Sequence, residues 1–317
     1  MKSNYQILAE IVEKDEAIRN ISIHRKADGT MDVEGNLKLW NSLVERFDCI
    51  KLWDKTPNYD DRDPNQIEPN IIFIKAQNTD ERKGTVIVSC GGGFETRTGC
   101  EGFNIAKYFA DAGFNCAILT YRLRPYSRQD ALDDITRAVK VLRYRADELN
   151  ITDKICCMGF SAGGMLSANL ATHFDTGKES DDPVEKMSSR PDAIVLGYGA
   201  FCFIGLHQGF FIDPFAQQIR NPFFKDVDEL RYFSPEINIS KDTPPFFIWQ
   251  TNSDDPRNAF CFGEALTANR IPFEMHLYPD GVHGIALADG HNDLNITAKQ
   301  TQSWAKLCAG WMTNQGL

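Results

Sequence analysis

A serine flanked by small residues lies at Gly159-Phe160-Ser161-Ala162-Gly163, which matches the pattern G-x-S-x-G. In this pattern a strand turns sharply into a helix, and the small neighbours leave the serine hydroxyl exposed. The context agrees, because the apolar run KICCMGF leads into the motif and the helix-like run MLSANLATHF leaves it. We therefore predict that Ser161 is a nucleophile, with a simple glycine-rich turn as the alternative interpretation.

The general base must come from elsewhere in the chain. A serine hydroxyl is a poor nucleophile near neutral pH, so it needs a base within hydrogen-bond reach and a third group that orients this base. His283, in the segment PDGVHG, follows the last strand-like run on a loop that can reach back over the edge of a sheet. His276 lies inside that run, where a structural role is expected. We predict His283 as the base, and a surface histidine is the alternative.

The acid that orients the base is expected after the preceding strand, in the order Ser, Asp, His. Asp254 and Asp255 follow the run PFFIWQTNS at that place. We favour Asp255, with Asp254 as a supporting acid or as a residue at a helix N-terminus. The choice between the two stays open at this point.

Acyl transfer also needs fixed N–H donors for the negative charge that develops on the carbonyl oxygen. The segment Cys90-Gly91-Gly92-Gly93-Phe94 follows the strand-like run TVIVS, and a loop without side chains lets backbone amides approach the oxyanion. The N–H of Ala162 completes the predicted set. A phosphate-binding loop is the rival interpretation, but the required Lys-Ser/Thr or spaced dinucleotide glycines are missing.

The elements that must position these residues alternate along the chain from Asn70 onward. Apolar strand-like runs and amphipathic helical stretches follow one another, which predicts an α/β fold with a mostly parallel sheet covered by helices on both faces. The expected strands are 70–76, 85–90, 116–121, 154–160, 193–199, 245–251 and 273–279.

Two further regions depart from this rhythm. Residues 1–68 predict an N-terminal extension with two short helices that packs on the main domain, which is residues 69–317; a partner-binding arm is the alternative. Residues 200–235 hold many aromatic side chains without clean periodicity, and they predict a cap or pocket wall beside the site.

Composition limits the partners. Of the 317 residues, 42% are hydrophobic and 25% charged, which suits a folded domain, and the net charge is −10. This charge repels phosphate backbones and anionic lipid, so we expect a small-molecule ester substrate and neither nucleic acid nor membrane as a partner. The first residues lack an apolar run of signal-peptide length, so a cytoplasmic location is expected. Exposed aromatic surface on the cap or extension is compatible with a homodimer.

The nine cysteines are odd in number and irregularly spaced. Several lie in strand-like runs, such as Cys116 and Cys156-Cys157, so free buried thiols in a reducing compartment are expected. No Cys-x-x-Cys pair argues for zinc, and we expect neither a metal nor a cofactor.

Taken together, these motifs resemble the α/β-hydrolase superfamily, and more closely its bacterial acetyl esterase and xylan-esterase-like branch. The resemblance covers about residues 69–317 through the glycine triplet, Glu101-Gly102, Tyr121-Arg122-Leu123, GFSAGG, DTPPFFIWQTNSDD and DGVHG. It implies an α/β-hydrolase fold with a small cap, and removal of small acyl groups, often acetyl, from sugars or other alcohols without metal or organic cofactor.

By resemblance, Ser161 attacks, His283 moves the proton, Asp255 orients His283, and the N–H groups of Gly92, Gly93 and Ala162 bind the oxyanion. The chain departs from the family pattern at Cys90, where relatives usually carry Pro or His. It departs again after Asp255, which is followed by Pro-Arg-Asn-Ala rather than by the residues that usually lead to Val-Pro. Two other functions remain open: a serine peptidase of the prolyl-oligopeptidase kind, and a ligand-binding protein on a hydrolase fold that has lost catalysis.

Overall fold

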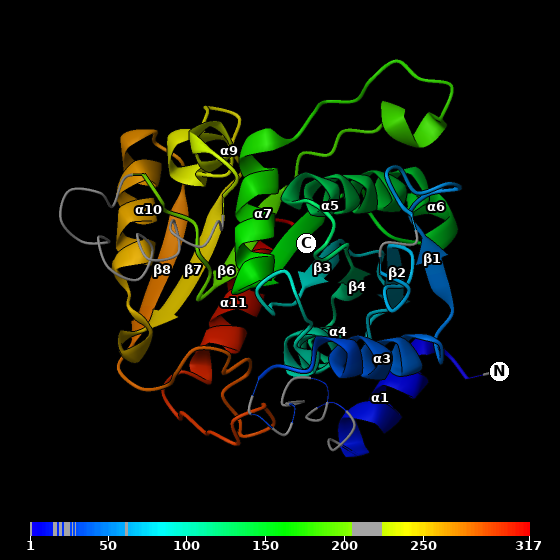
Figure 1. Ribbon diagram of the computed structural model, residues 1–317, viewed down its shortest axis with the longest axis horizontal. Coiled ribbons are helices and arrows are strands. Elements are labelled where there is room, and N and C mark those ends of the chain that lie inside the picture. The colour runs from blue at the N-terminus through cyan, green and yellow to red at the C-terminus, as the bar shows by residue number, and fades with distance from the viewer. Residues whose placement is uncertain are drawn as a thin grey trace.

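The computed structural model describes residues 2–14, 18, 21, 26, 28, 30–60, 63–204 and 224–317. Within this part of the chain, eight strands form one sheet in the order β1-β2-β4-β3-β5-β6-β7-β8 (Figure 1). The strands are β1 (Cys49–Lys51), β2 (Asn70–Ile74), β3 (Thr85–Ser89), β4 (Asn115–Thr120), β5 (Ile155–Phe160), β6 (Ala193–Gly197), β7 (Phe246–Thr251) and β8 (Phe273–Tyr278).

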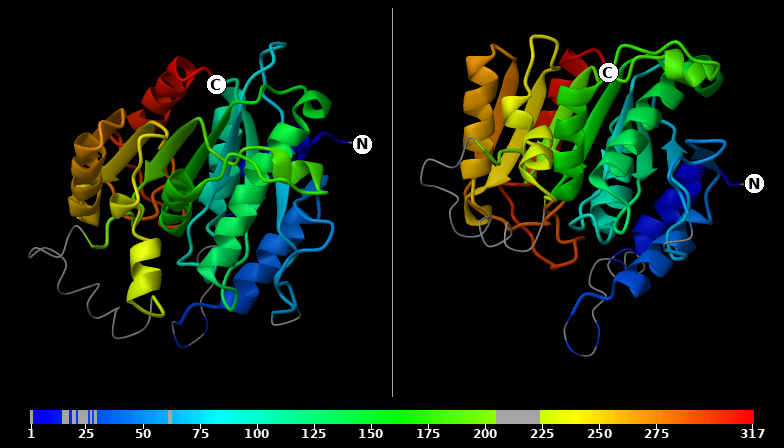
Figure 2. Two further views of the ribbon diagram at one scale, coloured as in Figure 1. Left: turned by 90° about the horizontal axis from the view of Figure 1, so that it is seen from above. Right: turned by 45° about the horizontal axis from the view of Figure 1, so that its top comes forward.

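Helices cover both faces of this sheet. On one side lie α1 (Asn4–Lys14), α3 (Val33–Val44), α4 (Ile105–Asp111) and α11 (Ser303–Asn314); on the other lie α5 (Arg128–Tyr144), α6 (Ala146–Leu149), α7 (Ala162–His173), α9 (Val227–Tyr232) and α10 (Arg257–Ala268) (Figure 2). Shorter turns are the π-helical η1 (Cys100–Asn104) and the 3-10 turns η2 (Pro183–Lys186), η3 (Pro235–Ile237) and η4 (Asn252–Asp254). Among the described helices, none is long and apolar enough to cross a membrane.

The sheet is parallel from β4 through β3 to β8, whereas β2 pairs antiparallel with both β1 and β4. The prediction of a mostly parallel sheet flanked by helices is thus confirmed. All seven predicted strands occur, each within a few residues of its expected bounds. Strand β1 was not predicted, because three residues are too short to show an alternating pattern.

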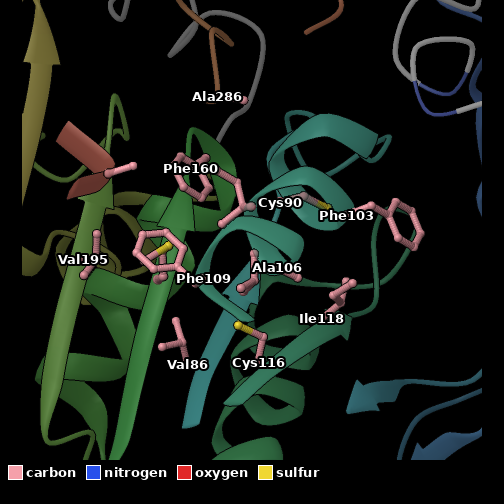
Figure 3. Close-up of a cluster of buried hydrophobic side chains, with 14 of the residues drawn as sticks. Val86, Cys90, Phe103, Ala106, Phe109, Cys116, Ile118, Phe160, Val195 and Ala286 are labelled. Atoms are coloured by element: carbon pink, nitrogen blue, oxygen red, sulfur yellow. The ribbon is translucent and has the colours of Figure 1, made fainter. Parts of the chain in front are cut away.

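Side chains of the central strands are buried on both faces of the sheet. Val86 and Val88 point into one core beside Phe109 and Phe160 (Figure 3), while Ile87 between them points into the other. Burial on both faces explains why these strands are continuous apolar runs rather than alternating ones. It leaves the polar residues of the site to the loops that follow the strands.

Residues of the predicted N-terminal extension share the core of the main domain. Leu8 and Ile11 of α1 and Trp40 of α3 are buried in the same hydrophobic cluster as α4 and α11, and β1 adds an edge strand to the sheet. In the predicted cap of residues 200–235, the aromatic side chains at 210, 211, 215 and 223 lie outside the described residues. The cap therefore stays a prediction.

The expectation of free thiols is wrong for one pair of cysteines. Cys202, in the loop after β6, forms a disulfide with Cys261 of α10, and their Cα atoms lie 6.3 Å apart. The two residues are separated by 59 positions in the sequence, so spacing alone could not pair them. The other described cysteines are free, and all of them except the half-buried Cys49 are buried.

Candidate active site

Ser161 lies at the sharp turn between β5, which ends at Phe160, and α7, which begins at Ala162. Its backbone angles, φ 51° and ψ −119°, are strained for a residue with a side chain. The turn packs very tightly, because a Cβ on Gly163 would lie 2.0 Å from the carbonyl oxygen of Ser89. The small residues around the serine are therefore required by the close approach of β3, β5 and α7.

His283 reaches Ser161 from the loop that follows β8. The distance from Ser161 Oγ to His283 Nε2 is 2.8 Å. Thr301 Oγ1 donates a hydrogen bond of 2.9 Å to Asp280 Oδ1, which ties the start of this loop to the segment before α11. The structure thus brings together two predicted site residues that are 122 positions apart in the sequence.

The third member of this contact is Asp254 and not Asp255, which corrects the choice favoured from the sequence. Asp254 Oδ2, at the end of η4, lies 2.8 Å from His283 Nδ1. Asp255 has a positive φ of 39° and is turned toward Arg257, whose Nε donates to it over 2.7 Å. The sequence signal that was missed is this arginine two residues after Asp255, which supplies that carboxylate with a partner of its own.

Electrostatics at His283 favour the charged imidazole. Desolvation lowers the pKa of His283, but the hydrogen bond and negative charge of Asp254, together with the charge of Glu101, outweigh it and raise the pKa above the usual value of 6.5. The hydrogen bond with Arg257 lowers the pKa of the Asp255 carboxyl. An imidazole stabilised in its charged form can take and hold a proton during a reaction.

The glycine loop after β3 is held by hydrogen bonds along its length. Tyr121 Oη donates to the carbonyl oxygen of Cys90 over 2.7 Å, and the N–H of Arg124 donates to the carbonyl oxygen of Phe94 over 2.8 Å. Gly92 has a φ of 124°, and a Cβ there would lie 2.1 Å from the carbonyl oxygen of Thr96. At position 92, therefore, only glycine fits the backbone of this loop.

The loop lies directly beside the serine. A Cβ on Gly91 would lie 2.7 Å from Ser161 Cβ. Ala162 is the first residue of α7, where backbone N–H groups have no acceptor within the helix. Cys90 is fully buried in the hydrophobic core (Figure 3), and this burial raises the pKa of its thiol to about 12. Cys90 thus places a neutral side chain in the core.

The motif Tyr121-Arg122-Leu123, which follows β4, holds the glycine loop in place. Arg122 is fully buried, and its Nε and Nη2 donate to the two carboxylate oxygens of Asp134 of α5 over 2.9 Å and 2.8 Å. A bidentate arginine–carboxylate pair has a fixed geometry, so it anchors the chain that follows β4 against α5. This anchoring places Tyr121 where its hydroxyl can hold Cys90.

Tyr198 is a residue at the site that sequence reasoning missed. It follows β6, has a φ of 36°, and its ring packs edge-on to the ring of His283 with 5.1 Å between centroids. The available signal was a tyrosine directly after a buried strand at the edge where the other site residues lie. Its contact with the imidazole ring makes it part of the site.

A cavity of about 760 Å³ lies beside the glycine loop. Its lining combines apolar and charged side chains, among them Phe94, Glu95, Arg124, Tyr126 and Glu229. Two of these lining residues, Arg124 and Glu95, form an ion pair of 2.7 Å. Within the described residues, no group of three or more His, Cys, Asp or Glu side chains could hold a metal ion.

Comparison with known proteins shows the family to which the chain belongs. The profile of the BD-FAE family matches residues 72–260, which include the glycine loop, Ser161 and Asp254. The crystal structure of an acetyl ester-xyloside bifunctional hydrolase from Caldicellulosiruptor lactoaceticus superimposes with a TM-score of 0.74 and 31% sequence identity, over 85% of this chain and 96% of that chain.

Two curated proteins are similar over part of their length. An endo-1,4-beta-xylanase B of Butyrivibrio fibrisolvens is 34% identical over 235 residues, which are 70% of this chain and 35% of that protein. A probable carboxylic ester hydrolase of Mycobacterium tuberculosis is 27% identical over 156 residues, 47% of this chain and 36% of that protein. The chain thus spans about a third of the length of these curated relatives.

Proposed function

Because the chain belongs to the BD-FAE family, within the esterase branch of the α/β-hydrolases, we propose that it is a serine carboxylesterase acting through Ser161, His283 and Asp254. One observation carries this proposal: His283 contacts Ser161 Oγ through Nε2 and Asp254 Oδ2 through Nδ1, with 2.8 Å at each contact. This is the arrangement that a serine needs to lose its proton near neutral pH.

The proposed reaction proceeds in two steps. Ser161 Oγ gives its proton to His283 Nε2 and attacks the ester carbonyl carbon, while the N–H groups of Gly92, Gly93 and Ala162 donate to the oxyanion. His283 then passes the proton to the alcohol oxygen as the ester C–O bond breaks, and the acyl group stays on Ser161. Water gives a proton to His283 and attacks the acyl carbon, and the serine oxygen leaves with that proton.

The proposed substrates are short acyl esters, above all acetyl esters, of carbohydrate-like alcohols. Support comes from the name of the Caldicellulosiruptor hydrolase, which acts on acetyl esters and xylosides, and from the similarity to a xylanase. We assign the cavity beside Phe94 and Glu95 to the alcohol part, because a lining that combines aromatic and charged side chains suits a sugar.

The test compares the wild-type protein with Ser161→Ala on p-nitrophenyl acetate, a p-nitrophenyl butyrate, an acetylated xylo-oligosaccharide and a dipeptide amide. We expect acetyl esters to be cleaved fastest and the amide hardly at all. Ser161→Ala should lower kcat by roughly 10⁴-fold or more and abolish labelling by a fluorophosphonate probe. Faster cleavage of the amide would indicate a peptidase, and absence of both labelling and turnover in the wild type would indicate a binding protein.

A further inference from the structure

Glu101 is a buried carboxylate beside the site that has no part in the proposed reaction. It lies in η1 and is 1% exposed. Its Oε2 accepts a hydrogen bond of 2.6 Å from the N–H of Gly91, and its Oε1 accepts one of 2.8 Å from Tyr198 Oη. Both oxygens therefore act as acceptors, which is the pattern of the ionised carboxylate. Burial raises the pKa of the Glu101 carboxyl, and the hydrogen bonds from Gly91 and Tyr198 oppose that rise.

This carboxylate connects the two loops that the reaction needs. Gly91 immediately precedes the glycines that supply the oxyanion donors. Tyr198, on the other side, accepts a hydrogen bond of 3.0 Å from the N–H of Ala286, three residues after His283. Since the Tyr198 oxygen accepts from Ala286, its single proton is directed to Glu101. A chain of three hydrogen bonds thus runs from the oxyanion loop to the histidine loop.

A neutral side chain of the same shape would not satisfy these contacts equally well. The amide nitrogen of glutamine would face either the N–H of Gly91 or the hydroxyl of Tyr198, both of which donate here. Burying a negative charge is costly unless every oxygen is hydrogen-bonded, so its presence at this point calls for a compensating benefit. The nearby imidazole offers one, because Glu101 lies close enough to favour its charged form.

The other titratable groups around Glu101 do not compete for this role. Burial raises the pKa of the Tyr198 and Tyr121 phenols and of the Cys90 and Cys100 thiols, so all four are neutral near pH 7. Asp254 contacts Nδ1 of the imidazole, which is the nitrogen that does not face Ser161. Between pH 5 and 8, His283 is thus the neighbour whose charge the carboxylate can influence.

We propose that Glu101 is a positioning residue, which holds the oxyanion loop and the histidine loop in one rigid frame and stabilises the imidazolium formed at each proton transfer. Its effect on the reaction rests on the proposed esterase function. The effect on the pKa of His283 does not rest on that function, because it follows from charge and geometry alone.

The test compares Glu101→Gln with the wild type and with Asp192→Asn. Asp192 also accepts from a strand N–H, that of Ile155 over 3.0 Å, but at the amino end of β5 and away from the site. For Glu101→Gln we expect kcat on p-nitrophenyl acetate to fall by roughly 10–100-fold with KM nearly unchanged, because a transition-state interaction is lost. For Asp192→Asn we expect wild-type kcat.

The titration of His283, followed by NMR of the imidazole protons, gives a second result that needs no turnover. Removing a nearby negative charge disfavours the imidazolium, so the pKa of His283 should fall by about 0.5–1 unit in Glu101→Gln and stay unchanged in Asp192→Asn. Wild-type kcat together with an unchanged titration in a folded Glu101→Gln variant would overturn the proposal. A wild-type protein that cleaves no ester would instead contradict the esterase function and leave the titration as the test.

If Glu101→Gln does not fold, Tyr198→Phe takes its place. This change keeps the ring against His283 and the charge of Glu101 but removes the hydroxyl that connects Glu101 to Ala286. We expect kcat to fall by about 3–10-fold, from loss of positioning alone, with the His283 pKa not lowered. Wild-type kcat in this variant would overturn the proposed frame.

Discussion

Replacing Asp254 by Asn tests the assignment of the acid most directly. The carboxylate lies 2.8 Å from His283 Nδ1, where it accepts the Nδ1–H and leaves Nε2 free to accept the proton of Ser161. The amide of Asn can donate to Nδ1, which moves the imidazole proton to Nε2 and prevents that nitrogen from acting as a base. Even if the amide oxygen faces the ring, the negative charge that stabilises the imidazolium is gone.

The size of the effect follows from these two losses. In hydrolases with such a triad, the loss of the carboxylate lowers kcat by about 10⁴-fold, and each factor of ten corresponds to ~1.36 kcal/mol, so the barrier rises by about 5 kcal/mol. The pKa of His283, which Asp254 raises, should fall, so the acid limb of kcat/KM moves to lower pH. A stopped assay on p-nitrophenyl acetate across pH 5–9 measures both the fall in kcat and the shift of the acid limb.

The matched control is Asp255→Asn. The side chains of Asp255 and Arg257 are each 39% exposed, and solvent screens an ion pair of this kind so that it contributes little to stability. Its kcat should therefore stay within about threefold of the wild type. A loss of about 10³-fold in Asp255→Asn, with Asp254→Asn retaining more than a tenth of the activity, would refute the assignment.

Two further predictions concern stability. In Gly163→Ala the new Cβ would lie 2.0 Å from the Ser89 carbonyl oxygen, so urea denaturation should show that the free energy of unfolding falls by about 3 kcal/mol. Gly310→Ala, at an exposed position of α11 with nothing within 4 Å of the new Cβ, should instead stabilise by about 0.5–1 kcal/mol. Trp40→Ala should lower the free energy of unfolding by roughly 3–5 kcal/mol, because the side chain is fully buried. Phe260→Ala, at a half-exposed side chain, should lower it by less than about 1 kcal/mol. Equal losses would show that the N-terminal segment does not share the core.

Features that depend on neighbouring residues could be predicted from the sequence. The seven longer strands are apolar runs bounded by turn residues, and the alternation with helical stretches indicates a parallel sheet. The turn around Ser161 could be located because its small residues are dictated by close packing at the turn itself. His283 could be chosen among the histidines because its loop follows a strand whose carboxyl end lies at the same edge of the sheet.

Features that depend on contacts between distant segments were decided only by the tertiary structure. Asp254 and Asp255 are chemically identical neighbours, and the turn of η4 together with Arg257 determines which one faces the imidazole. The disulfide between Cys202 and Cys261 requires a loop and a helix to lie side by side, which cysteine spacing does not encode. The carboxylate of Glu101 acquires its partners from the loops that follow β3 and β6, because side-chain direction and register are set by packing of the whole sheet rather than by local sequence.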